Sequence, residues 1–309
     1  MWGLTSGVLG LLSENCPSGG SAYLRLAQLT VNGLALGSII ALAAVGLTLT
    51  YGILRLPNFA HGDLVTLGAY LTLSANLLGL PIAIALLVGA LGSIVFVLLT
   101  EKLLWQPMRS QRATMTTLII ISIGLALFLR NGVLFVWGSS NQAYELPVLP
   151  ALQILCVRIA TYRLIVIGLA IAVIVALHYI LQNTKIGKAM RAVADDLDLA
   201  RVTGIDVERV VFWTWIIAGG LTAIAGGFYG LTTAVRPNMG WFLILPLFTS
   251  VILGGIGNPY GAIAGALIIG VAQEVSTFWI PSEYKLAVAL VIMMLVLLFR
   301  PQGLFRGML

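Results

Sequence analysis

Apolar residues follow one another along this chain in long runs, and glycines, prolines and charged residues separate the runs. A run of about 20 apolar residues is long enough to cross a bilayer as a helix. The pattern predicts an all-α fold, a polytopic transmembrane bundle of about eight to ten spans. Nine runs qualify, at about 26–50, 62–78, 81–104, 115–137, 162–182, 210–234, 242–257, 259–280 and 286–300.

Two places are expected to interrupt these helices. Pro57 lies in the break between Tyr51 and His61, and the short run 242–257 ends in a glycine-rich turn. Irregular backbone at membrane depth is tolerated only where protein or a water-filled cavity surrounds it. In transporters such segments often mark the translocation pathway. We therefore expect some spans to be interrupted or re-entrant, while a simple tight turn at the membrane surface stays the alternative.

The composition fits one membrane domain. The chain is 60% hydrophobic and only 9% charged, whereas soluble domains carry about 25% charged residues. Its 34 glycines suit helices packed closely in lipid. We divide the chain into an outer-surface N-terminal segment, 1–25, and a single transmembrane domain, 26–309. The first segment has an apolar run without a positively charged start, which makes it a poor signal peptide.

The lysines and arginines predict the orientation, because cytoplasmic loops of membrane proteins carry an excess of both. Placing the loops 105–114 and 183–209 and the C-terminus on one side gives that side eleven cations, against five on the other. We therefore predict a cytoplasmic C-terminus and an external N-terminus. The eleven are Arg55, Lys102, Arg109, Arg112, Lys185, Lys188, Arg191, Arg201, Arg209, Arg300 and Arg306; the five are Arg25, Arg158, Arg163, Arg236 and Lys285.

Several kinds of chemistry leave no trace in the sequence. The two cysteines, Cys16 and Cys156, form no metal-binding motif, and whether they pair in a disulfide stays open. There is no Walker A sequence, so ATP hydrolysis would need a separate subunit. No HExxH or GxSxG motif is present either. We therefore predict neither an enzyme, nor a metal site, nor a bound cofactor, and no nucleic-acid partner.

The loop 183–209 is the longest charged stretch of the chain. Its apolar residues recur at helical spacing from Met190 to Ala200, which predicts one amphipathic helix outside the bilayer. Gly204 follows as a stop, since glycine tolerates the left-handed conformation at a helix C-terminus. Such a helix could lie on the membrane interface or dock on a cytoplasmic partner. Residues 198–204 loosely fit the E-A-A-x-x-x-G pattern of ABC-importer permeases, whose loop inserts into a groove of the ATPase subunit.

Four segments together resemble the branched-chain amino-acid ABC permeases of the LivH type. The stretch from Tyr51 to Asp63 resembles their YG…NFAHG(D/E) signature, and residues 188–205 resemble their coupling segment. Residues 251–261 resemble their LGG-G-PGA turn, although Tyr260 intervenes, and residues 298–303 resemble their FRP-G end. The resemblance covers about residues 28–306.

The resemblance implies a permease for branched-chain or other neutral amino acids, driven by ATPases through alternating access in a bacterial inner membrane. Its partners would be a second related permease, two cytoplasmic ATPases and an external substrate-binding protein. The implied coupling residues are Lys188, Arg191, Asp195, Asp196, Asp198, Ala200 and Gly204. The implied pathway residues are Asn58, Phe59, His61, Asp63, Gly254, Gly255 and Gly257.

Some roles stay open at this point. Asp63 either lines the pathway or caps its helix, and capping is the simpler interpretation. Arg130 and Glu274 lie inside spans and either pair with another charge or reach the interface. A urea or short-amide ABC permease would share these motifs. An ion-coupled secondary carrier is the rival class, and Asp63 and Glu274 are the acids that could bind its coupling ion.

Overall fold

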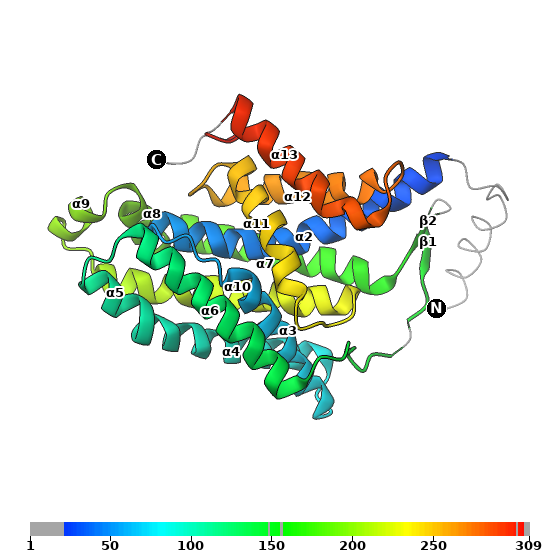
Figure 1. The fold of residues 1–309 in the computed structure, drawn as a ribbon, viewed down its shortest axis with the longest axis horizontal. Coiled ribbons are helices and arrows are strands. Elements are labelled where there is room, and N and C mark those ends of the chain that lie inside the picture. Colours follow the sequence, from blue (N-terminus) through cyan, green and yellow to red (C-terminus); the bar gives the residue numbers. More distant parts are fainter. Residues whose placement is uncertain (1–21, 148, 155–156, 301, 306–309) are drawn as a thin grey trace.

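The protein is a bundle of helices that run mainly along one long axis. This computed structural model describes residues 22–147, 149–154, 157–300 and 302–305. Figure 1 shows the exposed helices α8 and α9 at one end of the bundle and the strands β1 and β2 at the other. The helices are α2 (Ala22–Leu54), α3 (His61–Leu77), α4 (Ile82–Thr100), α5 (Gln106–Ser110), α6 (Met115–Trp137), α7 (Thr161–Asn183), α8 (Lys185–Asp195), α9 (Leu197–Val202), α10 (Val207–Thr232), α11 (Met239–Gly254), α12 (Pro259–Ser276) and α13 (Lys285–Phe299).

Each of the nine predicted spans corresponds to a helix in the described part of the chain, so the polytopic all-α bundle is confirmed. Six helical stretches within the described residues are long and apolar enough to cross a membrane. The other three are α3, α11 and α12, which are shorter or less apolar. Helices α11 and α12 pack against α2, and α3 packs against α4 and α10.

Two segments differ from the prediction. The helix that begins at Ile82 continues past 104 to Ser110, through a π-helical turn at Glu101–Trp105. It stays helical because Arg109 pairs with Glu101 about two turns away and Trp105 is buried against Trp215. The mixed segment after α6 contains two short antiparallel strands, β1 (Leu152–Ile154) and β2 (Val157–Ile159).

Helix α2 is the central element. Nearly all of its residues from Ala35 onwards are buried, and it packs against α12 and α10. Its glycines allow an unusually close approach: a Cβ atom on Gly33 would lie 2.6 Å from the Cα of Val271 in α12. Such small-residue contacts replace the hydrophobic effect as the reason for helix association in lipid.

The bundle separates the two groups of cations that the charge count distinguishes. Arg55, Arg109 and Arg112 line one hollow at the end where α2 stops and α6 begins. Arg163 and Arg236 line another at the end where α7 begins and α10 stops. The structure therefore places these five arginines at opposite ends as the charge count predicts, while which end faces the cytoplasm remains a prediction.

Candidate translocation and coupling sites

The break between α2 and α3 enters the bundle. Arg55 adopts a positive φ of 51°, and α3 does not begin until His61. The Nε2 atom of His61 lies 2.8 Å from the carbonyl oxygen of Ala43. Ala43 precedes the end of α2 by eleven residues, or about 16 Å of helix. The intervening segment therefore turns back along α2, and α3 starts inside the bundle.

Asn58 and Phe59 shape this re-entrant segment. Asn58 is fully buried, and its side-chain oxygen accepts a hydrogen bond from the backbone N–H of Ala60 at 3.0 Å. The N–H of Phe59 donates to the hydroxyl of Ser122 in α6 at 3.2 Å. The Phe59 ring is 37% exposed and packs against Phe248 of α11, with centroids 5.0 Å apart. Phe59 is thus the part of the segment that reaches the surface of the chain.

His61 joins three helices. It is 1% exposed, and its Nε2 atom lies 3.2 Å from the hydroxyl of Thr222 in α10 as well as close to Ala43. A carbonyl oxygen can only accept a hydrogen bond, so the short distance to Ala43 requires the proton on Nε2. The imidazole therefore donates to α2 from the start of α3 and holds both against α10.

Asp63 pairs with Arg130, so its interpretation as a side-chain cap is wrong. The cap position of α3 is Ala60, and no side chain caps that end. Instead the Arg130 guanidinium donates to both carboxylate oxygens of Asp63, at 3.3 and 3.2 Å. Asp63 still lies in the first turn of α3, where the helix dipole favours its charge. The pairing that the sequence left open for Arg130 is confirmed.

Helix α11 also begins inside the bundle, next to the start of α3. The N–H of Gly240 donates to the hydroxyl of Thr66 at 2.9 Å, and a Cβ on Gly62 would overlap the backbone of Gly240. Arg130 lies over the ring of Trp241, 4.5 Å from its centroid. Helices α3 and α11 thus begin side by side inside the bundle. The Asp63–Arg130 ion pair and the exposed Trp241 lie next to these two helix starts.

The glycine-rich turn lies elsewhere. Gly254 ends α11, and Gly255 and Gly257 adopt positive φ angles before Asn258 caps α12. The N–H of Gly257 donates to the hydroxyl of Thr48, near the end of α2. The structure therefore places these glycines in a tight turn at the end of the bundle, against the last turns of α2 that lead into the break.

The loop after α7 contains two helices, so the prediction of one continuous amphipathic helix is wrong. Asp196 interrupts it with an extended backbone, and its side chain accepts hydrogen bonds from the N–H groups of Asp198 and Leu199 at 2.9 and 3.0 Å. An aspartate that can cap a new helix competes with continuation of the old one. Helices α8 and α9 therefore meet at an angle fixed by this cap.

Gly204 ends α9 as the sequence predicts. Its φ is +86°, its N–H donates to the carbonyl of Arg201, and the N–H of Ile205 donates to that of Ala200. This is the bonding of a Schellman motif, in which a left-handed residue closes a helix. A Cβ at Gly204 would meet no atom within 4 Å, so the strain of the backbone is what calls for glycine here.

The outer surface of the helix pair is exposed. Met190, Val193 and Ala200 are buried against the bundle, whereas Lys188, Asp195 and Asp198 face outwards. Two apolar side chains of α9 also point away: Leu199 is 62% exposed and Val202 is 86% exposed. The pair therefore offers a preformed surface that its own chain leaves uncovered.

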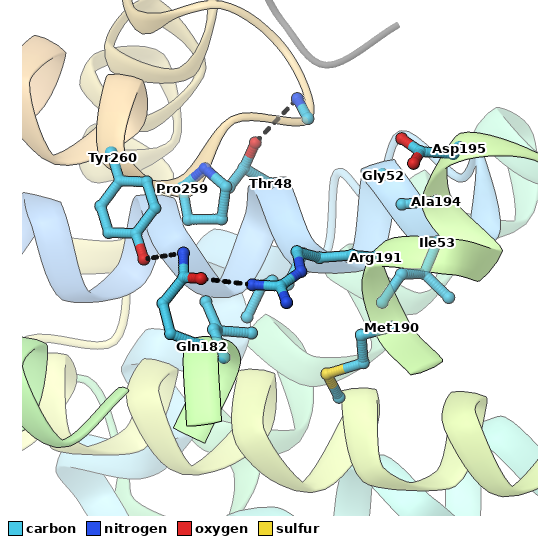
Figure 2. A pocket seen from close by; sticks show the side chains of 13 residues that line it. Thr48, Gly52, Ile53, Gln182, Met190, Arg191, Ala194, Asp195, Pro259 and Tyr260 are labelled. Atoms are coloured by element: carbon cyan, nitrogen blue, oxygen red, sulfur yellow. Dashed lines mark hydrogen bonds between the residues drawn. The ribbon is translucent and has the colours of Figure 1, made fainter. Parts of the chain in front are cut away.

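A chain of hydrogen bonds ties α8 to the glycine-rich turn (Figure 2). Arg191 donates to the side-chain oxygen of Gln182 at 2.6 Å, and the amide nitrogen of Gln182 donates to the Tyr260 hydroxyl at 3.1 Å. The Nδ1 atom of His178 lies 2.8 Å from the same hydroxyl. Tyr260, which departs from the family's motif, thus joins α7, α8 and α12.

Sequence reasoning missed the partners of the predicted residues. Ser122, Thr222 and Trp241 lie 60 or more positions from the residues they support, and no local pattern links them. Glu274 was left open, and it pairs with Lys285 at 2.6 Å. Cys16, Cys156 and the segment 1–21 lie outside the described residues, so the disulfide stays untested.

A bundle of apolar helices, two of them starting inside it, with a capped and exposed helix pair at one end, defines a polytopic membrane permease. The comparisons with known proteins then show its family. Residues 29–297 match the family model described as the permease component of the branched-chain amino acid transport system. The chain belongs to this family.

Individual relatives agree over nearly the whole chain. It is 32% identical to the high-affinity branched-chain amino acid transport system permease protein LivH of Salmonella typhimurium, covering 91% of this chain and 96% of that protein. It is 31% identical to BraD of Pseudomonas aeruginosa, with the same coverage. A probable LivH of Methanocaldococcus jannaschii is 29% identical over 86% of this chain and 88% of its own length.

Proposed function

We propose that this chain is one membrane-spanning subunit of an ABC importer for branched-chain or other neutral amino acids. Family membership supports the transport role, and the names of the relatives supply the substrate class. ATP would be bound and hydrolysed by two separate cytoplasmic subunits. A second related permease and an external substrate-binding protein would complete the complex.

The exposed helix pair α8–α9 is the observation that carries the coupling role. Its caps at Thr184, Asp196 and Asp206 hold its shape without any partner. Its uncovered surface includes Leu199 and Val202, which a soluble subunit could cover. The bonds from Arg191 through Gln182 to Tyr260 would carry a movement of α8 into the end of α12.

The re-entrant start of α3 and the start of α11 form the proposed moving part of the pathway. Phe59, Trp241 and the Asp63–Arg130 pair lie together on one side of the chain. A partly exposed ion pair within a spanning helix is costly against lipid and is favoured against protein or water. We propose that this side faces the second permease and the substrate.

The rival carrier mechanism finds little support in the same geometry. Its coupling ion would have to bind Asp63 or Glu274, yet each already pairs with a cation of the chain. A urea or short-amide permease stays the alternative within the ABC class. Uptake into vesicles separates the classes: an ABC permease needs ATP and its partner subunits, whereas a carrier needs only an ion gradient.

Gly204→Val tests the coupling role. Valine opposes the positive φ and costs about 1–2 kcal/mol locally. Because the loop lies outside the membrane-spanning helices, the variant should insert normally but lose its ATPases on purification and lose uptake. Gly79→Val is the matched control: its φ is also +86° and its surroundings are equally open, but it lies at the other end of the bundle. Equal copurification and uptake in both variants would refute the coupling role.

Cysteine labelling tests the orientation. Single cysteines near Arg109, Asp196 and Arg306, in a chain without its two native cysteines, should react only with reagents applied from the cytoplasm. A cysteine at Gly79 should react only from outside, since that turn lies at the opposite end. Labelling of the Asp196 position from outside would overturn the orientation and the coupling role together.

A further inference from the structure

A cavity of about 670 Å³ lies at the end of the bundle opposite α8–α9. Helices α2, α10, α11, α12 and α13 all contribute to its wall. Its size falls within the range of small-molecule sites, about 300–1,000 Å³. It is distinct from the break, because it lies on the other side of α11.

Helix α11 separates the two places through its helical periodicity. Trp241 and Phe248 share one face of the helix with the break. Phe242 and Pro246 lie about a quarter turn or more away and line the cavity, together with Leu243. These three give the cavity an apolar wall that reaches well into α11.

Proline adds a polar feature to this wall. Pro246 lies inside α11 and has no N–H, so it cannot donate to the carbonyl oxygen of Phe242. Both residues line the cavity. A carbonyl oxygen without its helical donor is a ready acceptor for a ligand ammonium group.

The rim of the cavity carries both signs of charge. Lys285 pairs with Glu274 at 2.6 Å, and the buried Gln273 donates to the carbonyl of Lys285 at 3.2 Å, which fixes this part of the rim. Arg236 and Glu283 also line the cavity, and neither forms an ion pair with any residue that the structure describes. Two cations, Arg236 and Arg163, and one anion therefore lie above an apolar wall, and Arg163 already donates to the side-chain oxygen of Asn32.

We propose that this outer cavity binds a zwitterionic amino acid with an apolar side chain, with Arg236 on the carboxylate, Glu283 on the ammonium group and Phe242 against the side chain. The substrate class rests on the proposed function; the site does not follow from it. Occupation of the cavity would place the substrate behind α11, one helix away from the break.

Binding of leucine to the purified transporter complex, without its external binding protein, tests the site directly. Radiolabelled leucine should bind saturably, whereas leucinamide, which lacks the carboxylate, and 4-methylpentanoate, which lacks the ammonium group, should compete at least tenfold more weakly. Arg236→Gln should weaken the binding of leucine at least tenfold and leave the binding of leucinamide nearly unchanged. Glu283→Gln should weaken the binding of leucine and leave the binding of 4-methylpentanoate nearly unchanged.

Two further variants sharpen the result. Phe242→Ala should reduce the preference for leucine over alanine. Arg25→Gln is the control, because Arg25 lies at the same end of the bundle and does not line the cavity. Absence of saturable leucine binding, or leucine binding that Arg236→Gln leaves unchanged, would overturn the proposal.

The same preparations separate this proposal from others. If Arg236→Gln and Glu283→Gln instead abolish stimulation of ATP hydrolysis by the substrate-free binding protein, the rim is a docking surface and the cavity proposal is wrong. ATP-driven leucine uptake by the wild-type complex is measured alongside. Uptake without binding to the cavity refutes only this inference, whereas binding without uptake refutes the proposed function.

Discussion

The break between α2 and α3 and the loop between α7 and α10 both interrupt long helices, but their polar groups are satisfied in different ways. At the break, His61 bonds to α2 and α10, Phe59 to α6, and Asp63 to Arg130. In the loop, each cap reaches only two or three residues along the chain. The bonds that hold the break therefore come from distant helices, whereas the caps that shape the loop are local.

This difference suits the two proposed roles. A segment inside the bundle can move only if distant helices move with it, so it is a natural place for a transition between two states. A loop whose helix ends are capped locally can present a fixed surface to a partner. Substitutions at the break should accordingly destabilise the whole protein, while those in the loop should act locally.

Removal of Arg130 should have the largest effect. Arg130→Gln leaves the Asp63 carboxylate buried without its partner, which typically costs about 3–5 kcal/mol. The melting temperature of the purified chain in detergent measures the loss. The double variant Asp63→Asn/Arg130→Gln removes both charges and should recover most of it. A single variant as stable as the wild type would show that the pair contributes nothing.

Transport by the double variant Asp63→Asn/Arg130→Gln separates a role of the ion pair in transport from its role in stability. Loss of uptake in an assembled complex of the double variant, which has no unpaired charge, would assign the pair a role in transport beyond stability. Normal uptake would instead remove Asp63 from the proposed pathway.

A methyl group at Gly62 should have the next largest effect. Its Cβ would overlap the backbone of Gly240 and force α3 and α11 apart, at about 1–3 kcal/mol for overpacking. Gly124→Ala on α6 is the matched control, because its Cβ would meet no atom within 4 Å. Thermal unfolding should show a lower melting temperature for Gly62→Ala and an unchanged one for Gly124→Ala. Equal stability of the two would mean that α3 and α11 do not meet as closely as described.

Loss of the cap between α8 and α9 should have the smallest effect. Asp196→Ala removes the acceptor of two N–H groups and costs about 1 kcal/mol. Hydrogen exchange should become faster at Asp198 and Leu199, with the melting temperature of the bundle unchanged. Asp195→Ala, next to it and without a capping bond among the described residues, should leave both quantities unchanged. A fall in melting temperature would show that the loop is not independent.

The same contrast explains what the sequence could predict. The spans, the ends of the break and the stop at Gly204 follow from apolar runs, Pro57 and the properties of glycine, which are all local. Asp196 also carries a local signal, because aspartate favours helix starts, but a continuous apolar periodicity conceals it. The pairing of Asp63 with Arg130 and the meeting of Gly62 with Gly240 depend on how helices distant in sequence pack. No spacing in one sequence records that packing.

The close fit of α2 against α12 sets a condition on how the protein is made. Gly33 and Val271 are roughly 240 residues apart, and synthesis at about 5–20 residues per second separates their appearance by about 12–48 s. During that interval the central helix of the bundle is present without the partner that covers its glycine face. The glycine face of α2 therefore stays without its packing partner until α12 has been synthesised.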